Sequence, residues 1–213
     1  MKAKQFDKIV EHYAKFFGSE KEPRIFGEIV VTHNLQVDLA LFAPSEKFQY
    51  QALCSIGASE YKMPLSNTVK SPYNEYLMFL DKDFDLKDDE NVWAINFLRY
   101  VAKFPFIQKT GLSNYHTIQL FDKEQEEELY NLHGNNMSFA YIMRPEAARK
   151  PALYKETFGS MFTKKTICFY QVMPITRAEY TENQQNGQNY LYFKFYHEKG
   201  CDKKELFLTR SKR

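Results

Sequence analysis

The side chains that could serve as nucleophile, base and acid are far apart along this sequence. In chain order they are Cys54, Ser55, Ser59, Glu75 and His116. A hydrolase would need a thiol or hydroxyl in contact with the histidine, and the histidine in contact with a carboxylate. The spacing does not bring these groups together, and the glycine-x-serine-x-glycine elbow of many hydrolases is absent. We therefore expect the serines to support a turn, with a hydrolase as an alternative.

The histidines, cysteines and glycines show no pattern typical of a metal or cofactor site. The five histidines are scattered, without an HExxH motif or a histidine–cysteine pair at ligand spacing. No glycine-rich nucleotide-binding pattern occurs. Cys54, Cys168 and Cys201 are widely spaced, which favours reduced thiols over a disulfide framework. We expect no metal, no cofactor and no enzymatic activity.

A pair of strands around Gly57 should position the serines and Glu75. Residues 52–56 form a strand-like run that stops at Gly57, where a glycine permits a turn that a side chain would block. Residues 60–72 are rich in proline and serine, as in a loop. Residues 73–80 are apolar on both faces, which predicts a central strand. The loop between these strands should lie on the rim of a mixed sheet.

The N-terminal part of the chain predicts a helix followed by an antiparallel meander. Aromatic and aliphatic residues have helical spacing over residues 3–17, and this face should pack on the sheet. Residues 24–32, 35–41 and 48–56 read as consecutive strands with short connections.

The second half predicts two helices among further strands. An apolar stripe indicates a helix over residues 92–104, capped by one of the polar residues at 88–91 and ended by Pro105. Residues 137–143 and 166–174 read as strands, and the second is apolar on both faces.

A helix and an aromatic strand should follow at the C-terminal end. Thr176 and Glu179 have the spacing of a capping box, so a helix should begin there and end at Asn186–Gly187. Residues 189–196 are aromatic and read as a strand, and residues 206–208 would add an edge strand.

Composition agrees with one α+β domain over residues 1–213, a mixed but mostly antiparallel sheet with helices packed on it. The 213 residues are 44% hydrophobic and 16% aromatic, enough for a sizeable core. We expect a single core that includes Leu53, Ile56, Leu77, Phe79, Trp93, Leu98, Ile167, Phe169 and Val172. The formal charge of +2 provides no global field for nucleic acid or an anionic membrane. Without an apolar signal core or spanning segment, the chain should be cytoplasmic.

Four blocks of the chain, in order, resemble the Suppressor of fused-like family. The first is Cys54–Ser59 with the strand from Glu75, and the second is the helix from Trp93 with its Arg-Tyr-Val pattern at 99–101. The third is the turn and strand of residues 110–118, and the fourth runs from the capping box to Gly187. The motif residues are Ser55, Gly57, Ser59, Glu75, Trp93, Glu179 and Gly187. The resemblance covers about residues 29–196, flanked by the helix at 3–17 and a basic tail at 199–213.

The resemblance implies a mixed α+β domain that binds proteins and has no enzymatic activity. In animals, the larger family member sequesters a transcription factor by clamping a peptide strand between this domain and a second one. Bacterial relatives are often single-domain immunity proteins of polymorphic toxin systems. A chain of 213 residues resembles the bacterial type. We therefore expect a protein partner, with a cognate toxin as the leading candidate.

The resemblance also points to residues that would contact the partner. Tyr100 matches a tyrosine near the peptide cleft of the animal protein. Tyr115, beside His116, stands where that protein has an aspartate, so the animal recognition chemistry does not transfer. The acidic run at 81–90, with a second run at 122–128, could face a basic toxin and raise the association rate. Its candidate contact residues are Asp83, Asp85, Asp88 and Asp89.

Nucleic-acid binding is the alternative function. Two segments, 144–165 and 199–213, each carry six basic and two acidic residues together with aromatic residues. Single-strand binders combine such residues. We expect the first segment to be irregular, because it contains two prolines and a glycine. The acidic runs elsewhere oppose a continuous basic footprint, so nucleic acid is the weaker expectation.

Overall fold

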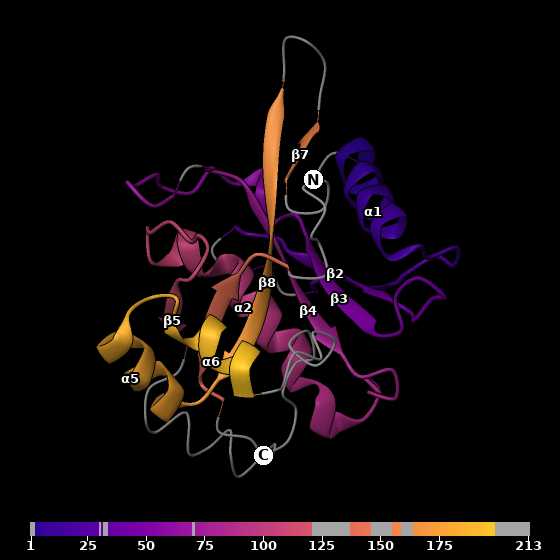
Figure 1. Ribbon diagram of the computed structural model, residues 1–213. Helices are drawn as coiled ribbons and strands as arrows, with labels where there is room; N and C mark the ends of the chain where they lie inside the picture. Colours follow the sequence, from indigo (N-terminus) through magenta and orange to yellow (C-terminus); the bar gives the residue numbers. More distant parts are fainter. Residues whose placement is uncertain are drawn as a thin grey trace.

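The computed structural model describes residues 3–29, 31, 34–69, 71–120, 137–145, 155–158 and 164–198. They form an eight-stranded sheet in the order β1-β2-β3-β4-β8-β6-β5, with β7 paired to β8 (Figure 1). The strands are β1 (Arg24–Phe26), β2 (Asp38–Phe42), β3 (Gln51–Ile56), β4 (Asn74–Leu80), β5 (Thr117–Gln119), β6 (Phe139–Met143), β7 (Lys155–Phe158) and β8 (Lys165–Ile175). The α-helices are α1 (Ala3–Phe17), α2 (Trp93–Ile107), α5 (Arg177–Asn186) and α6 (Tyr190–Glu198), and short 3-10 turns occur at Ala58–Glu60 and Asp89–Asn91.

The sheet is mixed, as the sequence predicts. Strands β1 to β4 form an antiparallel meander, in which β3 pairs with β4 from Gln51↔Leu80 to Cys54↔Leu77. β4 then pairs in parallel with β8, with Glu75 opposite Phe169. β6 and β7 both pair antiparallel with β8, along successive parts of its length. All seven residues of β4 are buried, which confirms a central strand.

Helices cover both faces of the sheet, and the buried residues form three clusters: one under α2, one under α1 and a third between β6, β8 and α6. The nine residues expected in one core are all buried. Leu53, Trp93, Leu98 and Val172 belong to the cluster under α2. Ile56, Leu77, Phe79, Ile167 and Phe169 belong to the cluster under α1, on the opposite face. The expectation of a single core is therefore corrected, because neighbouring strand residues point to opposite faces.

Helix α2 starts and ends differently from the sequence prediction. It runs through Pro105 to Ile107, and the Gln108 amide donates to the Phe104 carbonyl at its end. Pro105 lacks one helical N–H donor, but it is buried, and the last turn is closed by the Gln108 amide. At the start, Val92 is the cap residue and makes no side-chain cap bond; a 3-10 turn leads into the helix instead of a polar cap.

Residues 190–198 form helix α6, so the strand predicted at 189–196 is wrong. Leu191 and Phe195 are four residues apart and lie on one buried face against β6 and β8. The Asn183 side chain accepts a hydrogen bond from the Leu191 amide and thereby holds the helix start. The helix before it, α5, has the predicted capping box at Thr176 and Glu179 and ends at Gly187. Aromatic content favoured a strand, but the burial has the period of a helix.

The structure corrects two further predictions from the sequence. The strand predicted at residues 24–32 ends at Phe26. Within the segment predicted to be irregular, residues 155–158 form β7. The acidic run at 122–128, the tail at 199–213 and the strand at 206–208 lie outside the described residues, as do residues 146–154 and 159–163 of the basic segment.

Candidate functional site

Glu75 lies in the middle of the sheet and is held by the serine–glycine motif. Its Oε1 accepts hydrogen bonds from the Gly57 amide at 3.0 Å, and from the Ser59 amide and hydroxyl at 3.0 and 2.7 Å. Its Oε2 accepts one from the Ser55 hydroxyl at 2.6 Å. Ser55 Oγ in turn accepts from the Tyr76 amide at 2.8 Å. The motif therefore surrounds a fully buried acid with four donors.

The backbone conformation of Gly57 allows the turn to supply hydrogen-bond donors to the buried Glu75 carboxyl group. Gly57 has φ of 117°, in the region that favours glycine, and this turn directs the amides of residues 57 and 59 toward the carboxyl group. Burial raises the pKa of Glu75, while the hydrogen bonds from Ser55, Ser59 and Gly57 act in the opposite direction. The motif has a structural task, the solvation of one buried carboxyl group.

The catalytic arrangement considered from the sequence is not assembled. Ser55 and Ser59 are fully buried and donate to Glu75. Burial also raises the pKa of Cys54, which keeps its thiol protonated. The His116 Nε2 instead lies 3.3 Å from the hydroxyl of Thr68, on a loop at the sheet rim. The nucleophile candidates and the histidine thus belong to different networks.

A groove of about 640 Å³ lies between α2 and the edge strand β5. One wall comes from Tyr100 and Phe104 of α2 and from Gln108, the residue that follows the helix, and the other from Thr117–Gln119 of β5. Within the described part of the chain, none of the residues that line the groove is an aspartate, glutamate, lysine or arginine. Among the described residues, β5 pairs only with β6, so its other edge lies along this groove.

His116 ties together two loops at the mouth of the groove. It bonds to Thr68 of the rim loop, and burial lowers its pKa while a hydrogen bond with the Gly111 backbone acts in the opposite direction. Gly111 is itself required for close packing, because a Cβ there would lie 2.4 Å from the Pro64 carbonyl oxygen. The rim loop and the segment before β5 therefore form one packed wall.

The structure separates the two tyrosines that the sequence singled out. Tyr100 lines the groove with His116. Tyr115 packs on the other side of the sheet, with ring centroids 6.4 Å from Tyr141 and 5.8 Å from Tyr192. It also has a left-handed φ of 68°, and its amide donates to the Ile142 carbonyl at 2.7 Å. This backbone conformation directs consecutive residues 115 and 116 to different surroundings.

The acidic side chains of the loop at 81–89 are exposed, and two apolar side chains of the same loop are buried in the core. Asp83, Asp85, Asp88 and Asp89 are all exposed. Phe84 and Leu86 between them are buried in the cluster under α2. The loop precedes the start of α2, whereas the groove uses its C-terminal half, roughly 16 Å away along the helix axis. The charges thus lie beside the groove and outside it.

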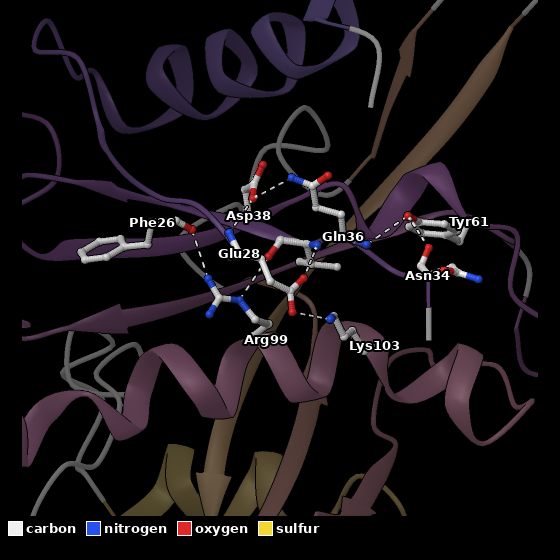
Figure 2. Close-up of polar contacts among 9 residues, drawn as sticks. Phe26, Glu28, Asn34, Gln36, Asp38, Tyr61, Arg99 and Lys103 are labelled. Carbon is white, nitrogen blue, oxygen red and sulfur yellow. Dashed lines mark hydrogen bonds and ion pairs between the residues drawn. The ribbon is translucent and has the colours of Figure 1, made fainter. Parts of the chain in front are cut away.

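The other flank of α2 carries a polar network that the sequence analysis missed (Figure 2). Lys103 forms an ion pair with Glu28, and the two side chains are only 5% and 7% exposed. Arg99 donates to the carbonyls of Val37 and Phe26 at 3.2 and 3.1 Å. The signal available from the sequence was a pair of basic residues four apart within an apolar helix.

Metal and membrane sites are not indicated by the described residues. They contain no group of three or more histidine, cysteine, aspartate or glutamate side chains arranged to hold a metal ion. Within the same part of the chain, no helix is both long and apolar enough to cross a bilayer.

The family comparison agrees with the motif geometry. The model of the Suppressor of fused protein family matches residues 33–206, which include the serine–glycine motif, Glu75, the groove and the capping box. The chain belongs to the Suppressor of fused family. No curated protein sequence matches the chain.

Solved Suppressor of fused structures share the fold at low sequence identity. The Sufu–Fu complex crystal structure aligns with a TM-score of 0.66 at 12% identity, covering 98% of this chain and 90% of that chain. A Suppressor of fused homologue from Neisseria gonorrhoeae aligns with a TM-score of 0.62 at 13% identity, covering 93% and 92%. Drosophila Suppressor of fused aligns with a TM-score of 0.61 at 14% identity, covering 98% of this chain and 50% of that chain.

Proposed function

We propose that this protein is a non-enzymatic binding module whose groove between α2 and β5 accepts an extended segment of a partner protein. The observation that carries the proposal is the edge of β5. Among the described residues it is paired on one side only, and its other edge runs along a groove whose described lining carries no charged side chain. An added strand would gain main-chain hydrogen bonds from β5, while alternate side chains would contact the aromatic wall of α2.

The lining indicates which segment would fit. Tyr100, Phe104 and Ile118 supply apolar contact, and Gln108 and Thr117 supply polar groups. A charged side chain in the groove would lose hydration without an ionic partner, so an uncharged segment is favoured. The family supports the binding role, since one related structure is a complex, that of Sufu with Fu.

We further propose that the partner is a toxin and that the protein acts as an immunity protein in the bacterial cytoplasm. The homologue from Neisseria gonorrhoeae supports a bacterial setting for the fold. The exposed acids at 83, 85, 88 and 89 would attract a basic toxin and raise the association rate more than the affinity. The buried free thiols of Cys54 and Cys168 agree with a reducing compartment.

Binding kinetics with the protein encoded by the adjacent gene test both levels of the proposal. Reversing Asp83, Asp85, Asp88 and Asp89 to lysine should slow association at least tenfold at low salt, and added salt should reduce the difference. The matched control reverses four exposed acids elsewhere: Asp7, Glu11, Glu20 and Glu22. If both variants slowed association equally, the effect would come from net charge and not from the position of the acidic loop.

The groove itself is tested by the dissociation rate. Tyr100→Ala should raise it about tenfold or more, because an aromatic side chain at the contact is lost. Tyr115→Ala serves for comparison, since Tyr115 packs on the other side of the sheet. An unchanged dissociation rate for Tyr100→Ala would exclude the groove. Turnover of the partner by the purified protein would replace the binding proposal with an enzyme.

A further inference from the structure

The hydrogen bonds between β5 and β6 determine which backbone groups of β5 point into the groove. The His116 carbonyl accepts from the Ile142 amide of β6 at 2.8 Å, and the Leu120 amide donates to the carbonyl just before β6 at 3.0 Å. Residues bonded to the neighbouring strand alternate with residues that are not, along an antiparallel pair. The backbone N–H and C=O groups of Thr117 and Gln119 therefore point away from β6, and both residues line the groove.

The side chains at this edge favour a strand that is apolar on one side. Ile118 belongs to the cluster under α2, against which Tyr100 and Phe104 of the groove wall also pack. Every second side chain of a strand added beside β5 would point to this wall. A charge there would lose hydration without an ionic partner in the described lining. These alternate residues must therefore be apolar.

The basic tail of this chain, which lies outside the described residues, contains a segment with these properties. Residues 199–213 include six basic and two acidic residues. Their longest uncharged stretch is Leu206-Phe-Leu-Thr209, which we call the LFLT segment. In an extended chain its two leucines share one side, and phenylalanine and threonine are enriched in strands.

The tail begins within reach of the groove. Helix α6 ends at Glu198, and its buried side chains pack on β6, the neighbour of β5 in the sheet. The ring of Tyr192 lies 5.8 Å from that of Tyr115, just before β5. A strand added outside β5 would lie about 10 Å from β6, which is twice the usual strand spacing. Residues 199–205 span about 24 Å when extended, which is enough for this path.

We propose that the LFLT segment pairs with the outer edge of β5, with its two leucines against the aromatic wall of α2, and thereby closes the groove. The pairing concerns this chain alone. Its consequence, that the tail competes with a partner for the groove, rests on the proposed binding function.

Residues 121–136, which follow β5 directly, are a poorer occupant. The first part of this segment is the acidic run, whose charges do not suit the groove. Its uncharged part, 129–136, contains three asparagines and a glycine, which are depleted in strands. The tail therefore fits the edge better than the segment nearest to it.

Hydrogen exchange in the full chain provides the first test. The double variant Leu206→Asp/Leu208→Asp, called the leucine variant, places two charges where the groove is apolar and should release the segment. We expect the Thr117 amide to exchange about tenfold faster or more, as measured by NMR, because its partner strand is lost. The Leu120 amide bonds toward β6 and should keep its protection.

A charge-matched variant is the control for this experiment. Gly200→Asp/Ser211→Asp adds the same charge to the tail but leaves the LFLT segment intact. Its Thr117 amide should exchange as in wild type. Equal exchange of this amide in wild type and in the leucine variant would refute the docking.

A synthetic peptide with the sequence of residues 205–210 supplies the segment in trans. Because a tethered segment has an effective concentration in the millimolar range, the peptide is added to the leucine variant at several millimolar. It should restore slow exchange of the Thr117 amide, whereas the same peptide with both leucines replaced by aspartate should not. Failure to restore slow exchange would contradict the pairing.

Photocrosslinking identifies the occupant of the groove. A benzophenone amino acid is placed at Gln108, which lines the groove, and at the exposed Glu11 of α1 as control. Mass spectrometry should find an adduct within one chain between position 108 and residues 206–209, and none from position 11. An adduct to residues 129–136, an adduct between two chains or no adduct would overturn the proposal.

Affinity for the protein encoded by the adjacent gene separates this inference from the proposed function. If that partner uses the groove, the leucine variant should bind it about tenfold more tightly, because a larger fraction of the protein is open. Faster exchange of Thr117 with unchanged affinity would support the tail pairing and refute the groove as the partner site. Unchanged exchange would refute the tail pairing whatever the affinity.

Discussion

The hydroxyls of Ser55 and Ser59 donate to Glu75, so their place in the motif follows from the needs of a buried acid. Without these donors, and the amides of residues 57 and 59, the carboxyl group would lack partners in the core of the sheet. A serine–glycine–serine pattern can thus resemble a reactive motif while serving a structural one.

The backbone requirement at Gly57 can be tested directly. Its φ of 117° is strained for any residue with a Cβ, so Gly57→Ala should lower the free energy of unfolding by about 1–3 kcal/mol. Gly27→Ala is the control, because a Cβ there would meet only the Asp38 side chain at 4.0 Å. Urea denaturation of both variants gives the comparison. Equal stabilities would show that the motif does not need glycine for its backbone.

A second residue-scale prediction concerns pH. Burial lowers the pKa of His116 in the folded protein below its ordinary value of about 6.5. Between these values the unfolded chain binds a proton that the folded protein does not, so stability falls as pH decreases below about 6.5. The urea midpoint of wild type should therefore drop more from pH 7.5 to pH 5 than that of His116→Gln. Parallel pH profiles would contradict this assignment.

At the scale of elements, α2 performs three tasks with three sides. Its apolar side packs on the sheet, Tyr100 and Phe104 line the groove, and Arg99 and Lys103 hold the segment between β1 and β2. Pro105 does not end the helix, so Gln108 is available to extend the groove wall. One helix thereby packs on the core, lines the groove and anchors the segment between β1 and β2.

The ion pair that links α2 to this segment gives the element-scale prediction. Lys103→Met or Glu28→Gln alone leaves a buried charge or its partner unpaired and should cost about 3–5 kcal/mol of unfolding free energy. The double variant should cost clearly less than the sum of the two single variants. A double-mutant cycle by urea denaturation measures the difference. Additive costs would mean that the pair is not coupled.

At the scale of the whole molecule, the core clusters under α1 and α2 share strands β2, β3, β4 and β8. Leu53 of β3 lies under α2, while its neighbours Ala52 and Cys54 lie under α1. Neither cluster can lose its sheet face without disturbing the other, because these four strands contribute to both. The sheet thus couples the two halves of the core mechanically.

This sharing predicts one cooperative unfolding transition. Trp93, the single tryptophan, reports on the cluster under α2 through its fluorescence. Far-UV circular dichroism reports on the sheet and all the helices. The two signals should give the same urea midpoint and slope, as expected for two-state unfolding. Separated midpoints would indicate that parts of the chain unfold independently.

Local patterns in the sequence determined the family, the mixed sheet, helices α1 and α5, and the central strands β4 and β8. Each of these depends on burial period, caps or glycine turns, which act over a few residues. Sequence reasoning failed where a distant residue decided the outcome. Glu28, within the strand predicted at 24–32, instead forms an ion pair with Lys103 of α2. Residues 190–198 form a helix whose buried side chains pack against β6 and β8.

For the candidate site too, the sequence indicated some residues, and only the tertiary structure showed where they lie. The sequence pointed to Tyr100, His116 and the acidic loop through resemblance and charge. Only the tertiary structure placed Tyr100 and His116 on one groove and Tyr115 behind the sheet. Only the tertiary structure also revealed that Glu28 and Lys103, 75 positions apart, form a buried ion pair. Contacts between residues so far apart depend on how the elements pack, and no pattern within a short stretch of sequence records that packing.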